Sequence, residues 1–239
     1  MKAPRFQLAD AILYQDEDYL FVHKPAHIST LEDRNDAVNM LAVVRQAEPD
    51  AQVCHRLDKD TSGVLAIARH PEAYRHLSMQ FEHRQVKKIY HALVDGLHQF
   101  QHTEVDKPIL KQPDGMVRIA REGKAAQTYF STLRSFRQHT LVECQPVTGR
   151  MHQIRIHLAT LGASIAGDDQ YGGKPVFLSA IKRDFKLKKE TEEEPLMKRM
   201  ALHAFSLEFD SLQGQRLRVE APYPKDLRAL IKQLEANSR

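Results

Sequence analysis

The sequence predicts an α+β protein built on an extended, mostly antiparallel mixed sheet flanked by helices and loops. Two observations lead to this fold class. Strand-like segments outnumber helical ones and mostly follow each other as hairpins, and the helical segments interrupt them irregularly, unlike those of a doubly wound fold. No internal repeat is present. Strands are expected at residues 11–15, 19–24, 52–58, 63–68, 87–96, 125–136, 139–147, 202–209 and 216–221.

Turn residues mark where the strands begin and end. An acidic turn separates AILYQ from YLFVHK, and Pro25 ends the second of these strands. Gly96 ends the strand KKIYHALVDG, and Gly214 lies in the turn of the last hairpin. Residues 97–122 are polar and are expected to form loops.

Four helices are predicted from the spacing of apolar residues, at residues 37–46, 71–81, 149–161 and 224–236. Proline at the start of the second and fourth, and Thr148 before the third, are typical of helix beginnings. The expected packing faces are, in chain order, Val38, Leu41 and Arg45; Tyr74, Leu77 and Phe81; Met151, Ile154, Leu158 and Leu161; and Leu227, Leu230, Ile231 and Leu234.

Length and composition predict one globular domain over residues 1–239, with its core at about 11–221. The net charge of +4 permits a polyanionic partner without demanding one. No apolar run approaches the roughly 18 residues of a membrane span, and the N-terminus lacks the apolar centre of a signal peptide. Cys54 and Cys144 are the two cysteines and lie far apart, which favours a reducing, cytoplasmic location.

A charged stretch, KRDFKLKKETEEEPLMKR at residues 182–199, lies within an expected insertion at about 174–200. Runs of charge usually face solvent. A surface loop is therefore the favoured interpretation, and an element that contacts RNA is the alternative.

The segment HRLDKDTSG at residues 55–63 places an arginine and a carboxylate two positions apart. If residues 52–58 form a strand, Cys54, Arg56 and Asp58 point to one face, and alternate residues such as Leu57 point to the other. Thr61, Ser62 and Gly63 then supply a turn whose hydroxyls can bond the carboxylate or the loop. The residues alone leave a plain surface ion pair as the alternative.

Two further segments carry candidate site residues. In TGRMHQIRIHLATLGASIAGDDQYGG, at 148–173, Arg155 borders the apolar stripe beside Ile154 and needs a carboxylate partner, for which Asp58 is a candidate. His152 and His157 fall on different helix faces, which argues against a zinc site. Tyr90, in KKIYHALVDG, shares a strand face with Ala92 and Val94, and a core tyrosine is the alternative.

These motifs together resemble the RluA family of pseudouridine synthases. HRLDKDTSG is similar to HRLDxxTSG, and residues 148–173 are similar to TGRxHQIRxHxxxxGxxIxGDxxYG. YLFVHKPAHIST, VKKIYHALVDG and MALHAFSLEF match the remaining family segments in the same order, over about residues 11–221. The resemblance implies the pseudouridine synthase fold, with an active-site cleft across the sheet, and an isomerase that converts uridine in RNA to pseudouridine.

The resemblance also implies roles for individual residues. Asp58 matches the essential aspartate, which acts as nucleophile or base, and Arg155 matches the arginine that pairs with it and keeps it ionised. Arg56 matches the arginine that fills the space left by the flipped base, and Tyr90 matches the tyrosine that packs against the uracil. Leu57 and Ile154 are expected as apolar walls. No cofactor or metal is implied.

Two departures from the family pattern are visible. Family members usually have glycine after KPA, where this chain has His27. Many relatives begin with an S4 RNA-binding domain, for which the sequence before residue 11 leaves no room, so RNA recognition is expected from the catalytic domain.

The expected partner is ribosomal or transfer RNA with the target uridine in a loop, since proteins read RNA mainly at single-stranded loops. A monomer without an obligate protein partner is expected, and no membrane. Phosphate contacts are expected from Lys59, Arg69, Lys87, Lys88, Arg121, Lys124 and Arg150. The alternative function is a non-catalytic RNA-binding or ribosome-assembly factor on the same fold. A metal-dependent hydrolase lacks a usable ligand cluster.

Overall fold

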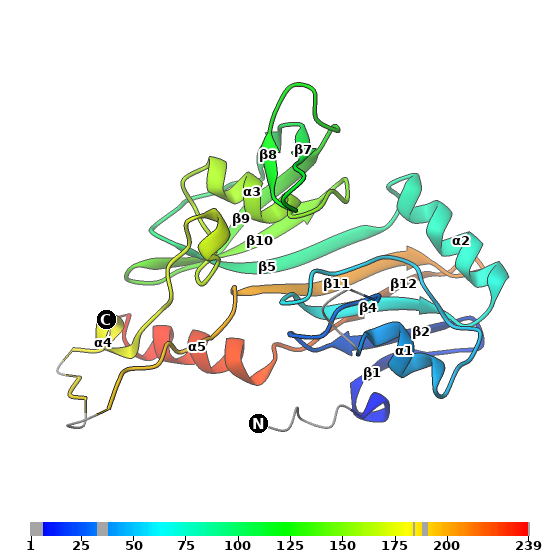
Figure 1. Ribbon diagram of the computed structural model, residues 1–239, viewed down its shortest axis with the longest axis horizontal. Helices are drawn as coiled ribbons and strands as arrows, with labels where there is room; N and C mark the ends of the chain where they lie inside the picture. Colours follow the sequence, from blue (N-terminus) through cyan, green and yellow to red (C-terminus); the bar gives the residue numbers. More distant parts are fainter. Residues whose placement is uncertain (1–6, 33–37, 184, 188–190, 239) are drawn as a thin grey trace. The chain divides into compact units, whose positions relative to one another are not determined.

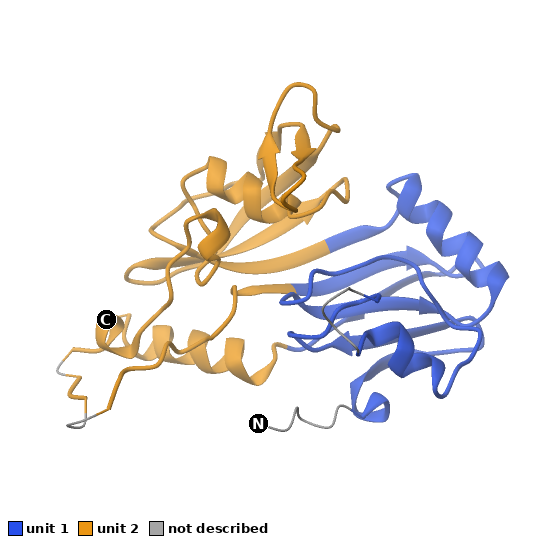
Figure 2. Cartoon of the chain, in the orientation of Figure 1, with its two compact units in different colours: residues 1–88, 204–222 blue, residues 89–203, 223–239 orange. Residues whose placement is uncertain are grey.

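The computed structural model of the protein describes residues 7–32, 38–183, 185–187 and 191–238. The chain separates into two compact units, coloured separately in Figure 2. Unit 1 comprises residues 1–88 and 204–222, and unit 2 comprises residues 89–203 and 223–239. The expected single catalytic domain over residues 1–239 stays a prediction. None of the helices within the described ranges is long and apolar enough to cross a membrane.

Unit 1 is built on a mostly antiparallel sheet, and its first hairpin, β1–β2, confirms the first predicted one. In the sheet β1 neighbours β2, β2 neighbours β4, β4 neighbours β11, and β12 and β3 pair with β11 and β4. The β1–β2, β2–β4, β3–β4 and β11–β12 pairs are antiparallel. The strands are β1 (Ile12–Gln15), β2 (Tyr19–Lys24), β3 (Gln52–Val53), β4 (Ser62–Ala68), β11 (Leu202–Asp210) and β12 (Arg216–Glu220), and a 3-10 turn, η1 (Leu8–Ala11), precedes them.

The central strands β2 and β4 are buried on both faces, which fits the unbroken apolar runs YLFV and VLAIA within them. Alternate residues contribute to two separate cores because side chains alternate across a strand. One core contains Tyr19, Phe21, Val64, Ala66, Phe209 and Leu77 of α2 (Pro71–Glu82). The other contains Leu20, Val22, Leu65, Ile67 and Met40 and Val44 of α1 (Met40–Arg45).

Helix α1 differs from its prediction in both its start and its packing face. It begins at Met40, and the side chain of Asn39 caps it by accepting from the amide of Ala42 at 2.9 Å. Val38 therefore precedes the helix and is 58% exposed, and Met40 and Val44 are the residues that pack. Residue 37 of the predicted helix lies outside the described residues.

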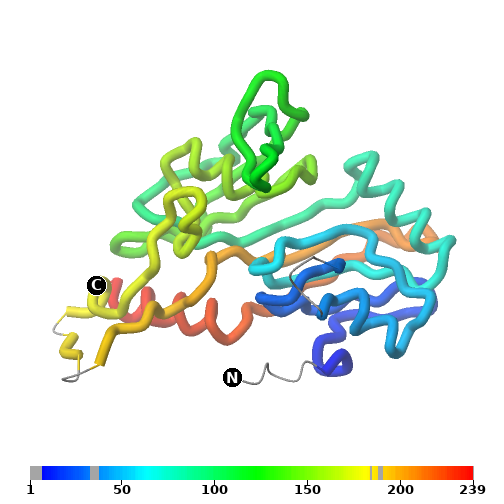
Figure 3. Tube along the Cα trace, in the orientation of Figure 1, coloured from blue at the N-terminus to red at the C-terminus, as the bar shows by residue number. Residues whose placement is uncertain are grey.

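Unit 2 contains a second antiparallel arrangement of strands, in the order β5, β10, β9, β6. These are β5 (Lys87–Asp95), β10 (His139–Pro146), β9 (Gln127–Ser135) and β6 (Thr103–Asp106). A separate hairpin of β7 (Ile109–Lys111) and β8 (Val117–Ile119) is drawn in green above α3 in Figures 1 and 3. The expectation of loops over 97–122 was therefore wrong in part. Strand β6 lies at the end of the sheet and, within the described ranges, pairs with β9 alone, which fits its polar sequence; Val105 is its buried residue.

The helices of unit 2 are α3 (Gln153–Thr160), α4 (Leu178–Ile181), α5 (Lys225–Ala236) and the 3-10 turn η2 (Asp169–Tyr171). Helix α5 confirms its prediction and buries Leu227, Leu230, Ile231 and Leu234. Helix α3 starts at Gln153 instead of directly after Thr148. His152 adopts a left-handed conformation, with φ of 52°, immediately before α3. The Thr148 hydroxyl donates to Gln153 at 2.7 Å, so it braces the turn that leads into the helix.

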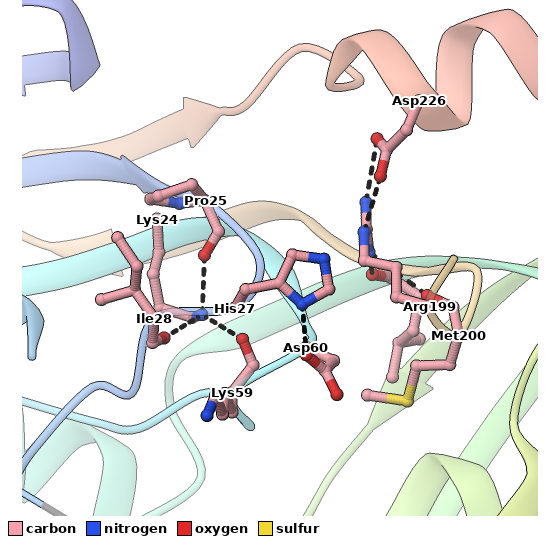
Figure 4. Close-up of polar contacts among 10 residues, drawn as sticks. Lys24, Pro25, His27, Ile28, Lys59, Asp60, Arg199, Met200 and Asp226 are labelled. Atoms are coloured by element: carbon pink, nitrogen blue, oxygen red, sulfur yellow. Dashed lines mark hydrogen bonds and ion pairs between the residues drawn. The ribbon is translucent and has the colours of Figure 1, made fainter. Parts of the chain in front are cut away.

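The charged segment 182–199 is not entirely solvated. Arg199 is 5% exposed and donates to both carboxylate oxygens of Asp226, at 2.7 and 3.2 Å (Figure 4). Its Nη1 also donates to the carbonyls of Met200 and Leu202. The end of the segment is thus fastened to the start of α5. Residues 184 and 188–190 of this segment lie outside the described residues.

Candidate active site

The motif that contains Asp58 is a loop, so the expected strand over 52–58 was wrong beyond Val53. The amide of Cys54 still donates to the carbonyl of Ala66 at 3.1 Å. The amide of the same residue, Ala66, donates to the imidazole Nε2 of His55, at 3.0 Å. The imidazole thus takes the place of a strand carbonyl and ends the pairing. It also stacks on Phe81, with ring centroids 4.8 Å apart.

Burial lowers the pKa of His55 to about 3, with a smaller contribution from the charge of Lys88. Below the ordinary histidine pKa of about 6.5, the unfolded chain binds a proton at this residue that the folded chain does not. Stability should therefore fall as the pH drops from about 6.5 towards 3. We expect His55→Gln to reduce the loss in unfolding free energy between pH 7.0 and 5.5 by about 1 kcal/mol. Urea unfolding at both pH values measures it.

The matched control is His83→Gln, which changes an exposed histidine at the end of α2. This variant should lose as much unfolding free energy between the two pH values as the wild type does. An unaltered pH dependence in His55→Gln would show that His55 is not held neutral by the fold.

The three predicted site residues in this loop, Arg56, Leu57 and Asp58, differ in their exposure to solvent. Leu57 is buried, and its amide and carbonyl both bond the hydroxyl of Thr30, at 3.1 and 2.8 Å. Arg56 is exposed and Asp58 is half-buried, so neither lies in the interior of unit 1. The carbonyl of Asp58 accepts from the amide of Thr61 at 3.1 Å, which closes the turn that was predicted after it.

The side chain of Lys24 stabilises this turn. Its side chain is fully buried, and Nζ donates to the carbonyls of Pro25, Ile28 and Lys59 at 2.9, 2.8 and 3.0 Å (Figure 4). Three carbonyl acceptors compensate the cost of burying an ammonium group. Lys24, the lysine of the KPA sequence, therefore joins the loop after β2 to the residue that follows Asp58.

The departure at His27 has a backbone explanation. His27 has φ of 66°, a left-handed conformation that glycine adopts more readily than other residues. Its Nδ1 lies 2.9 Å from a carboxylate oxygen of Asp60, and both side chains are largely exposed. Exposed ion pairs of this kind contribute little stability. The chain thus keeps the conformation that glycine favours, with a different residue.

Gly63 explains why the motif ends in glycine. It has φ of 124°, and a Cβ placed there would lie 2.1 Å from the carbonyl oxygen of Ala204 in β11. No side chain fits at that distance. The TSG and LHA motifs, 141 residues apart, thus meet at one backbone contact in unit 1.

Unit 2 carries the other predicted residues. Tyr90 lies in β5 opposite Cys144 of β10, is half-buried and packs against the core of the unit. Ala92 and Val94, on the same strand face, are fully buried. Ile154 is also part of this core.

Arg155 is held by a carboxylate that the sequence analysis did not name. Its guanidinium donates to both oxygens of Asp168, from Nε at 2.6 Å and Nη2 at 2.7 Å, and Nη2 also donates to Gln170 at 2.6 Å. Arg155 is 7% exposed and Asp168 is 2% exposed. The signal for Asp168 was present in the GDxxYG part of the motif. The pairing of Arg155 with Asp58 would join the two units and stays a prediction.

The two histidines of this segment contact protein groups. His157 is fully buried between the Thr128 hydroxyl, 2.9 Å from Nδ1, and the Lys107 carbonyl, 3.0 Å from Nε2. His152 Nδ1 lies 2.9 Å from the hydroxyl of Tyr171. Within the described ranges, no group of three or more His, Cys, Asp or Glu side chains could hold a metal ion.

The residues expected to bind phosphate divide into two groups. Arg69 supports the fold, since it donates to the carbonyl of Asp16 at 2.5 Å and to Glu48 at 2.8 Å. Lys88 is largely buried. The others are exposed or half-buried: Lys59, Lys87, Arg121, Lys124 and Arg150.

A family model described as RNA pseudouridylate synthase matches residues 18–160, which is more than half of the chain. The chain belongs to this family. Ribosomal large subunit pseudouridine synthase C of Salmonella typhi is 36% identical over 239 residues, covering 97% of this chain and 72% of the relative. The protein of the same name from Escherichia coli (strain K12) is 36% identical over 235 residues, covering 95% and 70%.

Solved structures agree with this membership. Human RNA Pseudouridylate Synthase Domain Containing 4 matches with a TM-score of 0.73 and 25% identity, covering 95% of this chain and 94% of that one. Human RNA Pseudouridylate Synthase Domain Containing 1 matches with a TM-score of 0.68 and 26% identity over the same shares. The resemblance to the RluA pseudouridine synthases and the predicted α+β fold are therefore confirmed. The protein is an isomerase that converts uridine in RNA to pseudouridine.

Proposed function

We propose that this pseudouridine synthase modifies uridines of the large-subunit ribosomal RNA and that Asp58 is its catalytic carboxylate. The observation that carries the choice of RNA is the 36% identity, over 97% of the chain, to a relative named for the ribosomal large subunit. The choice of Asp58 is supported by its place in a braced turn: Lys24 binds the next carbonyl, and Asp58 itself stays half-buried.

The reaction rearranges atoms within one nucleotide. The C1′–N1 bond of uridine breaks, the uracil turns, a C1′–C5 bond forms, and the C5 proton moves to the ring nitrogen through solvent or a side chain. Asp58 acts as a nucleophile or as a base on the ribose, and either role needs the ionised carboxylate. Because no atom is gained or lost overall and no net oxidation occurs, the rearrangement consumes no co-substrate.

The remaining site residues would support this step. Arg155 provides a buried positive charge that favours an ionised carboxylate in its vicinity. Arg56, which is exposed, would fill the space left when the uridine leaves its stack. Tyr90 would pack against the uracil and help to remove the C5 proton. Leu57 and Ile154, both buried, would form the apolar walls behind these groups.

The RNA would be held chiefly through its phosphates by Lys59, Lys87, Arg121, Lys124 and Arg150, a contact that weakens with salt. The target uridine would lie in a loop, where its base can leave the stack. We further propose that the enzyme acts as a monomer in the cytoplasm. The cysteines Cys54 and Cys144 are both free, consistent with a reducing compartment.

The test is to map pseudouridine in total RNA from the host with the gene present, deleted, or replaced by Asp58→Asn. A large-subunit ribosomal site lost in both altered strains supports the proposal. A site lost in transfer RNA instead would keep the reaction and correct the substrate. If no site changes, purified protein on host transcripts separates a redundant enzyme from a non-catalytic RNA-binding factor, which would bind RNA and leave it unmodified.

A further inference from the structure

Tyr171 lies between the Arg155 guanidinium and the β7–β8 hairpin. The central carbon of the guanidinium is 4.8 Å from the centre of the Tyr171 ring. This is within the range of an attractive cation–π contact, which strengthens when the pair is removed from water. Arg155 is almost fully buried, so the ring and the Asp168 carboxylate both restrict where the guanidinium can lie.

The hydroxyl of Tyr171 reaches the hairpin. The amide of Val117 in β8 donates to this hydroxyl at 3.3 Å, and Nδ1 of His152 lies 2.9 Å from it. The backbone of Tyr171 is fixed separately, because the Ser164 hydroxyl donates to its carbonyl at 2.7 Å. One side chain therefore contacts the hairpin, the residue before α3 and the arginine of α3.

The hairpin depends on such contacts. Strands β7 and β8 pair with each other, and Ile109 of β7 also bonds the backbone of Lys124, at 2.9 Å in both directions. A two-stranded hairpin is marginally stable by itself in water, so its packing contacts contribute to holding it. Its small core contains Ile109, Val117 and Ala126, against which Met151, Ile156 and Tyr171 pack. Tyr171 is thus part of the surface on which the hairpin is seated.

We propose that Tyr171 is a positioning residue that holds the Arg155 guanidinium in place and couples its position to the packing of the β7–β8 hairpin. The ring would support the guanidinium, and the hydroxyl would fasten the hairpin. Loosening the hairpin would then loosen the arginine. The consequence for catalysis rests on the proposed function, in which Arg155 keeps Asp58 ionised.

Two substitutions separate the two halves of the side chain. Tyr171→Phe keeps the ring under Arg155 and removes the bonds to Val117 and His152. Tyr171→Leu also removes the aromatic face. The matched control is Tyr129→Leu, which removes a half-buried tyrosine that stacks on His102 in the same unit.

In kinetics on the RNA identified by mapping, kcat of Tyr171→Leu should fall about tenfold with KM within about threefold, the size of a lost cation–π contact. Tyr171→Phe keeps the ring but loosens the hairpin, so it should lower kcat by a smaller factor, about threefold. By hydrogen–deuterium exchange, residues 109–119 should exchange at least about tenfold faster in both variants. Tyr129→Leu should leave kcat and exchange at 109–119 as in the wild type.

A readout without RNA distinguishes failure of this inference from failure of the proposed function. The Nε–H signal of Arg155 in a nitrogen-15 spectrum, identified by its loss in Arg155→Lys, should shift or broaden in Tyr171→Leu. If the wild type modifies no RNA but this signal changes, the structural coupling stands and the proposed function fails. An unchanged signal, or wild-type exchange at 109–119 in both variants, would overturn the inference.

Discussion

Replacing Asp58 with asparagine is expected to lower the rate of pseudouridine formation at least about a thousandfold, while RNA binding stays within a few-fold. The amide has nearly the size of the carboxylate but cannot act as a nucleophile or base. The turn should persist, because it is closed by the backbone carbonyl of Asp58 and by Lys24. The measurements are single-turnover kinetics with purified enzyme and binding by filter retention.

Asp60→Asn is the matched control for this prediction. Asp60 lies two residues further along the same turn, and its carboxylate contacts the largely exposed His27 at 2.9 Å. Since such an exposed contact contributes little, this variant should fold normally and keep its turnover within a few-fold. Full activity in Asp58→Asn would refute the role of Asp58. Equal losses in both variants would show that the turn, and not the carboxylate, was damaged.

The spacing of apolar residues predicted the strands and helices whose burial follows directly from that spacing. Strands β2 and β4 are apolar on both faces, and α5 has one apolar stripe, so their sequences indicate them directly. The loop that contains HRLD could not be predicted from the spacing of apolar residues. Strand β3 ends before this loop because the side chain of His55 accepts the hydrogen bond that a backbone carbonyl would otherwise accept. The alternation of apolar and polar residues does not indicate such a side-chain contact.

The candidate site was proposed from its motifs, but its supporting contacts could not be predicted from them. Family resemblance named Asp58 and Arg155, whereas the buried partner of Arg155 lies 13 residues downstream, in a loop whose course depends on tertiary packing. The KPA sequence at residues 24–26 was likewise visible as part of a family motif. Its physical role appeared when Lys24 was found to bind three carbonyls, one of them next to Asp58.

Arg155→Ala is expected to lower the unfolding free energy by about 3–5 kcal/mol and to lower turnover as well. The substitution strands the carboxylate of Asp168, whose side chain is 1% exposed and loses two charge-assisted hydrogen bonds. Arg155→Lys keeps the positive charge but not the two-pronged geometry, so it should fall between the wild type and alanine. Urea unfolding and single-turnover kinetics measure the two effects.

A double-mutant cycle with Asp168→Ala tests the cause of this loss. If the cost arises from an unpaired buried charge, removing both partners should cost less than the sum of the two single substitutions, by more than about 1 kcal/mol. Turnover should stay low in the double variant, because the positive charge that we propose favours an ionised Asp58 is still missing. Additive stability losses would show that Asp168 is not the partner that stabilises Arg155. Wild-type melting and turnover in Arg155→Ala would remove Arg155 from the site.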